Sequence, residues 1–223
     1  MYNVTGDYMR LHSYLKAFKG LTKSEVMEYY KKGLITVNDI PQKLSYEINK
    51  NDVIKIGNEI IPEKTYLYYL YYKPRGVIST IRKCDYSYIN TINMEEKLTP
   101  AGRLDKQSEG LMILSNDGKF IHEYSTPLMH KKKYIITLES EITNEFLSNL
   151  GKSYELDGRN TTPFNIEIND KYNVTVELSE GIYHQIRRIV KLSGNKVINL
   201  KRISIGEYNL SDMKPGELKK ITV

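Results

Sequence analysis

Cysteine is almost absent from this 223-residue chain, in which Cys84 is the only one. A single thiol excludes an intramolecular disulfide. The four histidines lie apart and have no second thiol beside them, so no set of zinc ligands can be assembled from the sequence. We therefore expect a cytoplasmic protein that holds no metal.

Long hydrophobic runs are absent as well. The most hydrophobic early segment, YLYYLYY at residues 66–72, is far shorter than the roughly 20 residues that a helix needs to cross a bilayer. The first ten residues, MYNVTGDYMR, lack the basic start and apolar stretch of a targeting peptide. We expect no membrane association.

Acidic residues are missing from one long segment. Residues 181–202 contain six of the 33 basic residues and no Asp or Glu, and the other 27 basic residues equal the 27 acidic ones in number. The whole net charge of +6 therefore belongs to this segment. Such a run is usually a solvated helix face, but it also suits a surface that follows phosphates, and we favour a nucleic-acid partner.

The first sixty residues predict two helices and a few short strands. Apolar residues recur with helical spacing over residues 9–18. In LTKSE, Thr22 and Glu25 have the spacing of a capping box, which predicts a second helix that ends before Gly33. LITVNDIP predicts a short strand and an Asn-Asp turn, and DVIKIG predicts another strand.

This N-terminal part resembles the small RNA-binding domain first seen in ribosomal protein S-four. The resemblance rests on MRLHSYLK, LTKSEVMEYYKKGLITVND and INKNDVIKIG. It predicts an S-four-like domain over residues 9–61, although so short a unit could also be the edge of a larger domain. The polar segment Pro62-Glu63-Lys64 is the expected linker to a second domain over residues 65–223.

The rest of the chain alternates predicted strands with short helices. This order favours an α+β domain around a mixed or antiparallel sheet. Strands are predicted in YLYYLYYK, LMIL, KKYIITL, FNIEI, NVTVEL and KVINLKRISIG, and helices in KFIHEYS, TNEFLSNL and YHQIRRIVKLSG.

One stretch, AGRLDKQSEGLMILSNDG at residues 101–118, concentrates the candidate chemistry. Gly102 permits a sharp turn, and the apolar run 111–114 predicts a strand that ends in the Asn-Asp-Gly turn. Asp105 is therefore expected on a loop just before a rigid strand, where catalytic groups are often mounted. The residues alone leave open whether it is catalytic, pairs with a basic neighbour or caps a turn.

The same stretch resembles the signature of the pseudouridine synthases, in the form carried by the RsuA-like branch. Three further segments agree in order and spacing: YKPRGVIST at residues 72–80, KKYIITL at 132–138, and EGIYHQIRRIVKLSGNKVINLKRISIG at 180–206. The four segments are spread over residues 72–206, which is most of the chain after the expected linker. The resemblance implies an enzyme that isomerises uridine in RNA to pseudouridine without a cofactor.

The resemblance also implies roles for individual residues. Asp105 would be the essential carboxylate, Arg187 the cation that keeps it ionised, and Tyr134 the ring that stacks on the target base. The target nucleotide must be flipped out of its helix. The expected substrate-binding residues are Arg103, which would fill the vacated stack, Leu200 as an apolar pocket wall, and Arg188, Lys191 and Arg202 of the basic segment. The Lys73-Pro74 pair is expected to pack beneath the catalytic loop.

Two other functions remain open from the sequence. The first is a catalytically inactive RNA-binding or ribosome-assembly protein, which would be expected to show a damaged motif. The second is a hydrolase that pairs Asp105 with Glu109; the resemblance instead makes Glu109 a support. The implied partner is ribosomal RNA of either subunit, or an assembly intermediate, bound by a monomer. Specificity is expected from the N-terminal domain and from loops such as residues 82–97.

Overall fold

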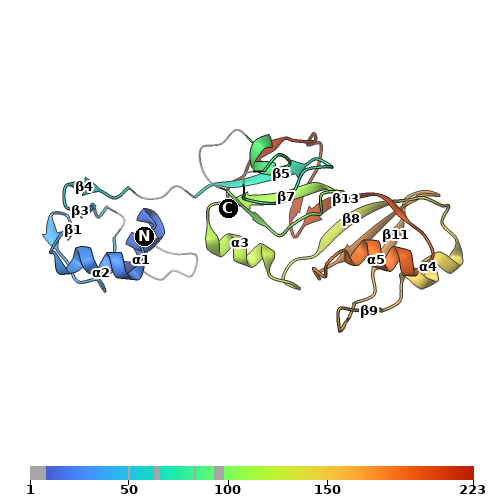
Figure 1. The fold of residues 1–223 in the computed structure, drawn as a ribbon, viewed down its shortest axis with the longest axis horizontal. Coiled ribbons are helices and arrows are strands. Elements are labelled where there is room, and N and C mark those ends of the chain that lie inside the picture. The colour runs from blue at the N-terminus through green and yellow to red at the C-terminus, as the bar shows by residue number, and fades with distance from the viewer. Residues whose placement is uncertain (1–8, 50, 63–65, 83, 93–97) are drawn as a thin grey trace. The chain divides into compact units, whose positions relative to one another are not determined.

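The computed structural model describes residues 9–49, 51–62, 66–82, 84–92 and 98–223 (Figure 1). Contacts divide the chain into two compact units, Met1–Thr65 and Tyr66–Val223. This division lies beside the proline-bearing segment in which the sequence places a linker. Residues 63–64 of that linker lie outside the described residues.

The first unit consists of two helices and a small antiparallel sheet. Helices α1 (Leu11–Lys19) and α2 (Lys23–Lys31) precede strands β1 (Ile35–Val37), β2 (Ile40–Pro41), β3 (Ile54–Ile56) and β4 (Glu59–Ile60), in the spatial order β2-β1-β3-β4. The predicted capping box is confirmed, because Thr22 and Glu25 exchange side-chain and backbone hydrogen bonds at the start of α2. The expected Asn38-Asp39 turn has both residues at positive φ, as a two-residue hairpin of this type requires.

The second unit is built on one mixed sheet, which confirms the predicted α+β class. Its strands are β5 (Tyr68–Lys73), β6 (Thr99–Ala101), β7 (Glu109–Ser115), β8 (Lys132–Leu138), β11 (Asn165–Ile168), β12 (Asn173–Leu178), β13 (Val197–Ile205), β14 (Tyr208–Asn209) and β15 (Leu218–Lys220). The main path runs β11-β12-β8-β13-β7-β5-β15, with β14 beside β13 and β6 beside β7. The β13–β7 pair is parallel, and the other named pairs are antiparallel.

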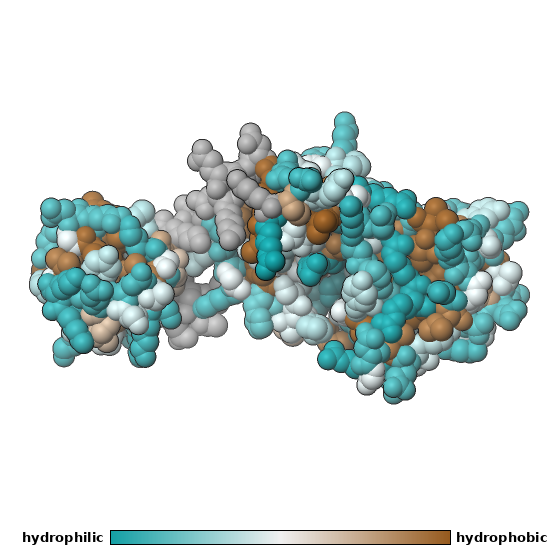
Figure 2. All heavy atoms as spheres, in the orientation of Figure 1, coloured by the Kyte–Doolittle hydropathy of each residue, from teal (hydrophilic) through white to brown (hydrophobic). Residues whose placement is uncertain are grey.

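Alternating side chains give this sheet two apolar faces. Along β7, Leu111 and Ile113 join one buried cluster, whereas Met112 and Leu114 join the other. A strand that is buried on both faces reads as a continuous apolar run, which is why LMIL stands out in the sequence. On the face visible in Figure 2, polar residues cover most of the surface and hydrophobic ones form separate patches.

In the described part of the second unit, three α-helices and a small hairpin complete the fold. The helices are α3 (Gly118–Ser125), α4 (Asn144–Leu150) and α5 (Gln185–Leu192), with a 3-10 turn at Tyr88–Thr91 and a hairpin of β9 (Glu155–Leu156) and β10 (Arg159–Asn160). Helices α4 and α5 lie side by side (Figure 1). The Asn-Asp-Gly stretch differs from the predicted turn, because Asp117 accepts hydrogen bonds from the first turn of α3 and so begins that helix.

Within the described residues, none of the helices combines the length and the apolarity needed to cross a bilayer.

Candidate active site

The loop that carries Asp105 is fixed on both sides of that residue. It lies between β6 and β7, so Asp105 comes just before a buried strand, as the sequence predicts. Before Asp105, the Ser79 hydroxyl donates to the Leu104 carbonyl (2.7 Å) and accepts from the Leu104 amide (3.1 Å). After it, the Lys106 carbonyl accepts from the amide of Gly76 at 2.7 Å. Because Ser79 and Leu104 are buried, these bonds have little competition from water and hold the loop in one position.

A close approach between two strands fixes where the loop enters β7. Gly110 pairs with Arg202 of the parallel strand β13. It has φ +113°, and a Cβ atom at this position would lie 2.2 Å from the Arg202 carbonyl oxygen. Only glycine fits there without moving one of the strands. The glycine of the Glu-Gly-Leu motif is therefore a packing requirement of the sheet that carries the loop.

Two side chains from the start of α5 reach the Asp105 carboxylate, which is 34% exposed. The Nε of Arg187 lies 4.0 Å from Oδ2, so the structure brings the predicted pair together. The Nε2 of His184 lies closer, 3.4 Å from Oδ1. The sequence analysis missed His184 as a neighbour of Asp105; its place three residues before Arg187, near the start of a helix, was the available signal.

Arg187 also ties α5 to the loop. Its Nη2 donates to the Gln107 carbonyl and to the Ser108 hydroxyl, both at 3.1 Å. Burial lowers the pKa of the guanidinium, the Asp105 charge raises it, and nearby Arg75 lowers it further. The Arg187 Nε is buried without a hydrogen-bond partner among the described residues. The guanidinium is thus held in place, with one donor facing the carboxylate unused.

A second cation, Lys73, lies close enough to the loop to interact with the charge of Asp105. Lys73 is fully buried, and its ammonium donates to the carbonyls of Pro74 and Val77 at 2.8 Å each. Burial lowers the pKa of Lys73 to about 8, against the opposing effects of Asp105 and Glu109. At neutral pH the lysine therefore remains charged and adds to the positive field around Asp105. The two hydrogen bonds hold the ammonium against the turn that follows β5.

Glu109 is engaged in structural hydrogen bonds. Its Oε2 accepts from the Tyr72 hydroxyl on β5 at 3.0 Å, and its Oε1 accepts from the Asn199 amide on β13 at 2.6 Å. The carboxylate also raises the pKa of Tyr72, after the larger effect of burial. Both oxygens are thus occupied by neighbouring strands, which suits a support for the loop better than the second carboxylate of a hydrolase.

Tyr134 and Leu200 lie on neighbouring strands and in one apolar cluster. On β8 and β13, Tyr134 pairs with Arg202, and Leu200 pairs with Ile136. Both side chains are buried in the cluster that also contains Leu104, the residue before Asp105. The Tyr134 hydroxyl has no hydrogen-bond partner among the described residues. The structure therefore connects both predicted residues, through apolar packing, to the base of the loop that carries Asp105.

The four other side chains that the sequence predicts to bind substrate differ in exposure and in their partners. Arg103 and Lys191 are exposed. Arg188 makes a two-pronged ion pair with Asp157, at 2.9 and 3.0 Å. Arg202 is only 2% exposed, and its Nε donates to the Leu111 carbonyl at 2.7 Å. The expectation that Arg202 binds RNA is therefore wrong for this conformation, in which it is an internal link between β13 and β7.

The basic segment as a whole also differs from the single cationic surface expected. Acidic residues from distant parts of the sequence neutralise several of its charges: besides the Arg187 and Arg188 pairs, Lys196 binds Glu139 at 2.6 Å. The Lys201 ammonium lies 5.5 Å from the centre of the Tyr72 ring. These 22 residues contain no acidic side chain, but in the folded chain acidic residues from other segments lie beside them, so the surface carries charges of both signs.

Clusters of three or more potential metal-binding side chains are not found in the part of the chain that the structure describes.

Comparisons with known proteins agree on one family. Residues 67–191 match the family described as RNA pseudouridylate synthase. The ribosomal small subunit pseudouridine synthase A of Pasteurella multocida is 33% identical, and the match covers 96% of both chains. An RNA pseudouridine synthase of Bacillus subtilis is 32% identical over 96% of this chain and 95% of its own.

A solved structure gives the same result for the fold. The crystal structure of a pseudouridylate synthase aligns with a TM-score of 0.67 at 29% identity and covers 96% of each chain. The family match includes Asp105, Tyr134 and Arg187, and the full-length relatives extend it across both units. The chain therefore belongs to the RNA pseudouridine synthases, in the RsuA-like branch.

Proposed function

We propose that this enzyme isomerises a specific uridine of ribosomal RNA, with Asp105 as its catalytic carboxylate. The observation that carries the proposal is the position of Asp105: on a loop pinned by Ser79 and Gly76, partly exposed, and faced by His184 and Arg187. A carboxylate that is partly exposed and mounted on a fixed loop can reach a substrate.

The reaction needs such a carboxylate. The bond between N1 of the base and C1′ of the ribose breaks, the base turns, and C5 bonds to C1′. The C5 proton is lost and N1 gains one, so no atoms are added or removed. Asp105 acts either as a nucleophile at C1′ or as a base at C2′, and both roles require the ionised form. The Arg187 guanidinium, 4.0 Å from Oδ2, is the cation beside this carboxylate, and the imidazole of His184 lies 3.4 Å from Oδ1.

The target base must leave its helix before the carboxylate can reach the sugar. Flipping a nucleotide costs a few kcal/mol, which contacts with the protein must offset. We assign this compensation to Tyr134, which stacks on the flipped base, and to Leu200, which forms an apolar wall of the pocket. Arg103, which is exposed and has no ion pair among the described residues, fills the vacated position in the helix.

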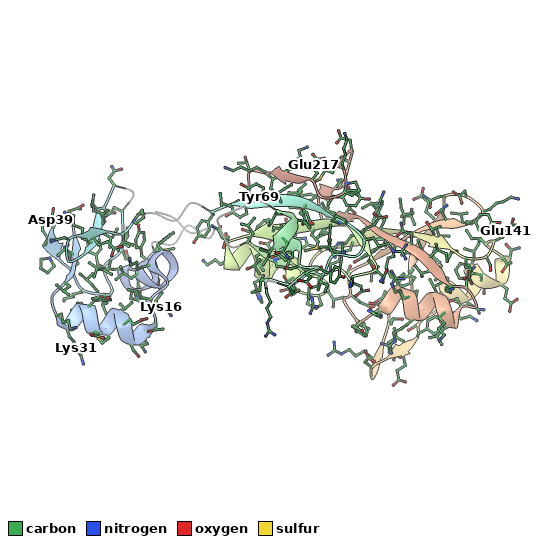
Figure 3. The ribbon with its side chains drawn as sticks, turned by 45° about the horizontal axis from the view of Figure 1, so that its top comes forward. Lys16, Lys31, Asp39, Tyr69, Glu141 and Glu217 are labelled. Carbon is green, nitrogen blue, oxygen red and sulfur yellow. The ribbon has the colours of Figure 1, made fainter. Side chains whose placement is uncertain are left out.

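Ribosomal RNA is the proposed substrate because of the relatives and the first unit. Relatives that match both units are named for the small ribosomal subunit. The first unit carries exposed lysines that form no salt bridge with the described residues, among them Lys16 on α1 and Lys31 on α2 (Figure 3). Lysines of this kind are suited to phosphate contacts. We propose that this S-four-like unit adds affinity for a folded ribosomal RNA.

The test is to incubate the protein and its Asp105→Asn variant with unmodified small-subunit and large-subunit ribosomal RNA, and to map pseudouridine along each. We expect one new site in the small-subunit RNA with the intact protein and none with the variant. RNA affinity should stay within about threefold, because asparagine keeps the size of the side chain. If the intact protein binds RNA but forms no pseudouridine, the assembly-factor alternative replaces the enzyme.

A further inference from the structure

Tyr183 presents an aromatic ring to solvent beside the catalytic carboxylate. Its side chain is 71% exposed. The ring stacks on the imidazole of His184, with centroids 3.9 Å apart and planes 15° from parallel. The same imidazole lies 3.4 Å from the Asp105 carboxylate. The stacked pair of rings therefore extends from solvent to the Asp105 carboxylate.

Tyr86 has a related arrangement on another loop. It is 58% exposed, and the ammonium of Lys106 lies 3.8 Å from the centre of its ring. Lys106 directly follows Asp105 in the chain. Two exposed tyrosines thus contact residues next to the catalytic carboxylate. Tyr183, in the loop before α5, stacks on His184, and Tyr86, in the loop between β5 and β6, contacts Lys106.

Neither ring has an evident structural purpose. Both side chains are mostly exposed, and neither hydroxyl has a hydrogen-bond partner within the part of the chain that the structure describes. Tyr172 contrasts with them: it is 41% exposed, but its hydroxyl donates to Glu141 at 3.1 Å. An exposed aromatic ring that is oriented in advance costs little conformational entropy when it binds a flat partner.

The substrate chemistry supplies that flat partner. Once a uridine is flipped out, the bases next to it lose a stacking neighbour. Unpaired RNA bases stack on aromatic side chains at a gain of about 1–3 kcal/mol each, and an adjacent cation strengthens the contact with the phosphate backbone. We propose that Tyr183 and Tyr86 are the platforms on which the unpaired bases flanking the target uridine stack. This inference rests on Asp105 being the catalytic carboxylate.

The first test is kinetic. On an RNA that the intact protein modifies, Tyr183→Ala should raise KM about 5- to 140-fold, the change that corresponds to losing one stacked base. The kcat should stay within about threefold. Tyr183→Phe should restore KM, because it keeps the ring. Tyr86→Ala should behave in the same way, and Tyr172→Ala, whose partner Glu141 is labelled in Figure 3, is the matched control with no effect.

The second test reports stacking directly. The chain has no tryptophan, so 2-aminopurine placed in the RNA can be excited without protein background. In one set of substrate RNAs, 2-aminopurine replaces each base that flanks the target uridine in turn. In a separate RNA, it replaces the central base of an oligouridylate. Binding of the intact protein should quench its emission through stacking, and the two alanine variants should lose the quench at one flanking position each.

Several results would overturn the inference. If Tyr183→Ala lowers kcat and leaves KM and the quench unchanged, Tyr183 acts by positioning His184 and not by binding a base. If both alanine variants match the intact protein, the rings are solvated surface. Failure of the proposed function gives a different pattern: no pseudouridine forms, while the oligouridylate measurement still reports whether the two rings stack on RNA.

Discussion

The imidazole of His184 lies 3.4 Å from the carboxylate of Asp105. This pair exists because His184 adopts a left-handed backbone conformation, φ +52°, as the last residue before α5. The chain turns there and directs the start of the helix, including Arg187, toward the loop that carries Asp105. The N-terminal end of the α5 dipole and the Arg187 guanidinium thus both add positive potential on this side of Asp105.

Arg187→Met should remove most of the activity. The substitution deletes the charge near Asp105 together with the bonds to Gln107 and Ser108. Since a small displacement of a catalytic group can cost about 100-fold in rate, we expect kcat to fall by roughly that factor while the protein stays folded. Arg187→Lys should be intermediate, because an ammonium keeps the charge but not the forked geometry.

The matched control for Arg187 is its neighbour Arg188, whose ion pair with Asp157 is exposed. Arg188→Met should leave kcat within about threefold, because exposed pairs contribute little. Full activity in Arg187→Met would show that Asp105 does not depend on the Arg187 guanidinium.

Ser79→Ala should loosen the catalytic loop. The Ser79 hydroxyl is the buried partner of both polar backbone groups of Leu104. Leaving them unsatisfied costs about 1–3 kcal/mol in the free energy of unfolding. Chemical denaturation measures that loss, and steady-state kinetics should show a fall in kcat that exceeds any rise in KM.

A matched control for Ser79 is Thr126→Ala, which removes a hydroxyl bonded to the His122 carbonyl at the exposed end of α3. We expect a change in stability within about 0.5 kcal/mol and no change in kcat. If Ser79→Ala loses stability but keeps kcat, the clamp holds the fold without positioning Asp105.

Local sequence patterns predicted most of the longer helices and strands, because alternation and capping depend on residues close together in the chain. The alternation of KKYIITL gives β8 with its observed bounds Lys132–Leu138, and the Thr22 capping box starts α2 as expected. The short strands β6, β14 and β15 were missed, since two or three residues carry too little periodicity and depend on neighbours such as β7, β13 and β5.

The site was only partly predictable, because partners that are distant in sequence decide whether a charged residue is buried, ion-paired or free to bind a substrate. Arg202 is buried because a carbonyl of β7 lies across from it, and Asp157 neutralises Arg188 from 31 residues away. No local pattern reports either contact. The Asp105–Arg187 pair was found only through the family resemblance, because residue spacing alone did not identify Asp105 as catalytic.

Gly110→Ala should destabilise the second unit strongly. A methyl group would lie 2.2 Å from the Arg202 carbonyl oxygen, at a φ of +113° that other residues rarely adopt. Overlap and backbone strain together should cost more than about 3 kcal/mol. Thermal unfolding should show a large fall in Tm.

Gly118→Ala is the control for Gly110. Gly118 begins α3, and a Cβ atom there would meet nothing within 4 Å. Alanine restricts the unfolded chain and suits a helix, so stability should rise slightly, by about 0.4–1 kcal/mol. Equal effects of the two substitutions would contradict the close approach of β7 and β13.

Lys73 should give the stability of the protein a specific pH dependence. Burial lowers its pKa to about 8 in the folded chain, from 10.5 when unperturbed. Between these values the unfolded chain holds a proton that the folded chain has released. The unfolded state thus binds more protons, so the free energy of unfolding should rise with pH, by about 1.4 kcal/mol per unit.

Comparison of the intact protein with Lys73→Met isolates this effect, because every other titrating group is common to both. Below pH 8 the buried charge lowers the free energy of unfolding of the intact protein by its full amount. Between pH 8 and pH 10 the free energy of unfolding of the intact protein should rise, relative to that of Lys73→Met, by about 2–3 kcal/mol. Urea denaturation at several pH values measures the difference. A constant difference over this range would show that Lys73 keeps its proton, and that Asp105 and Glu109 offset its burial more fully than the lowered pKa implies.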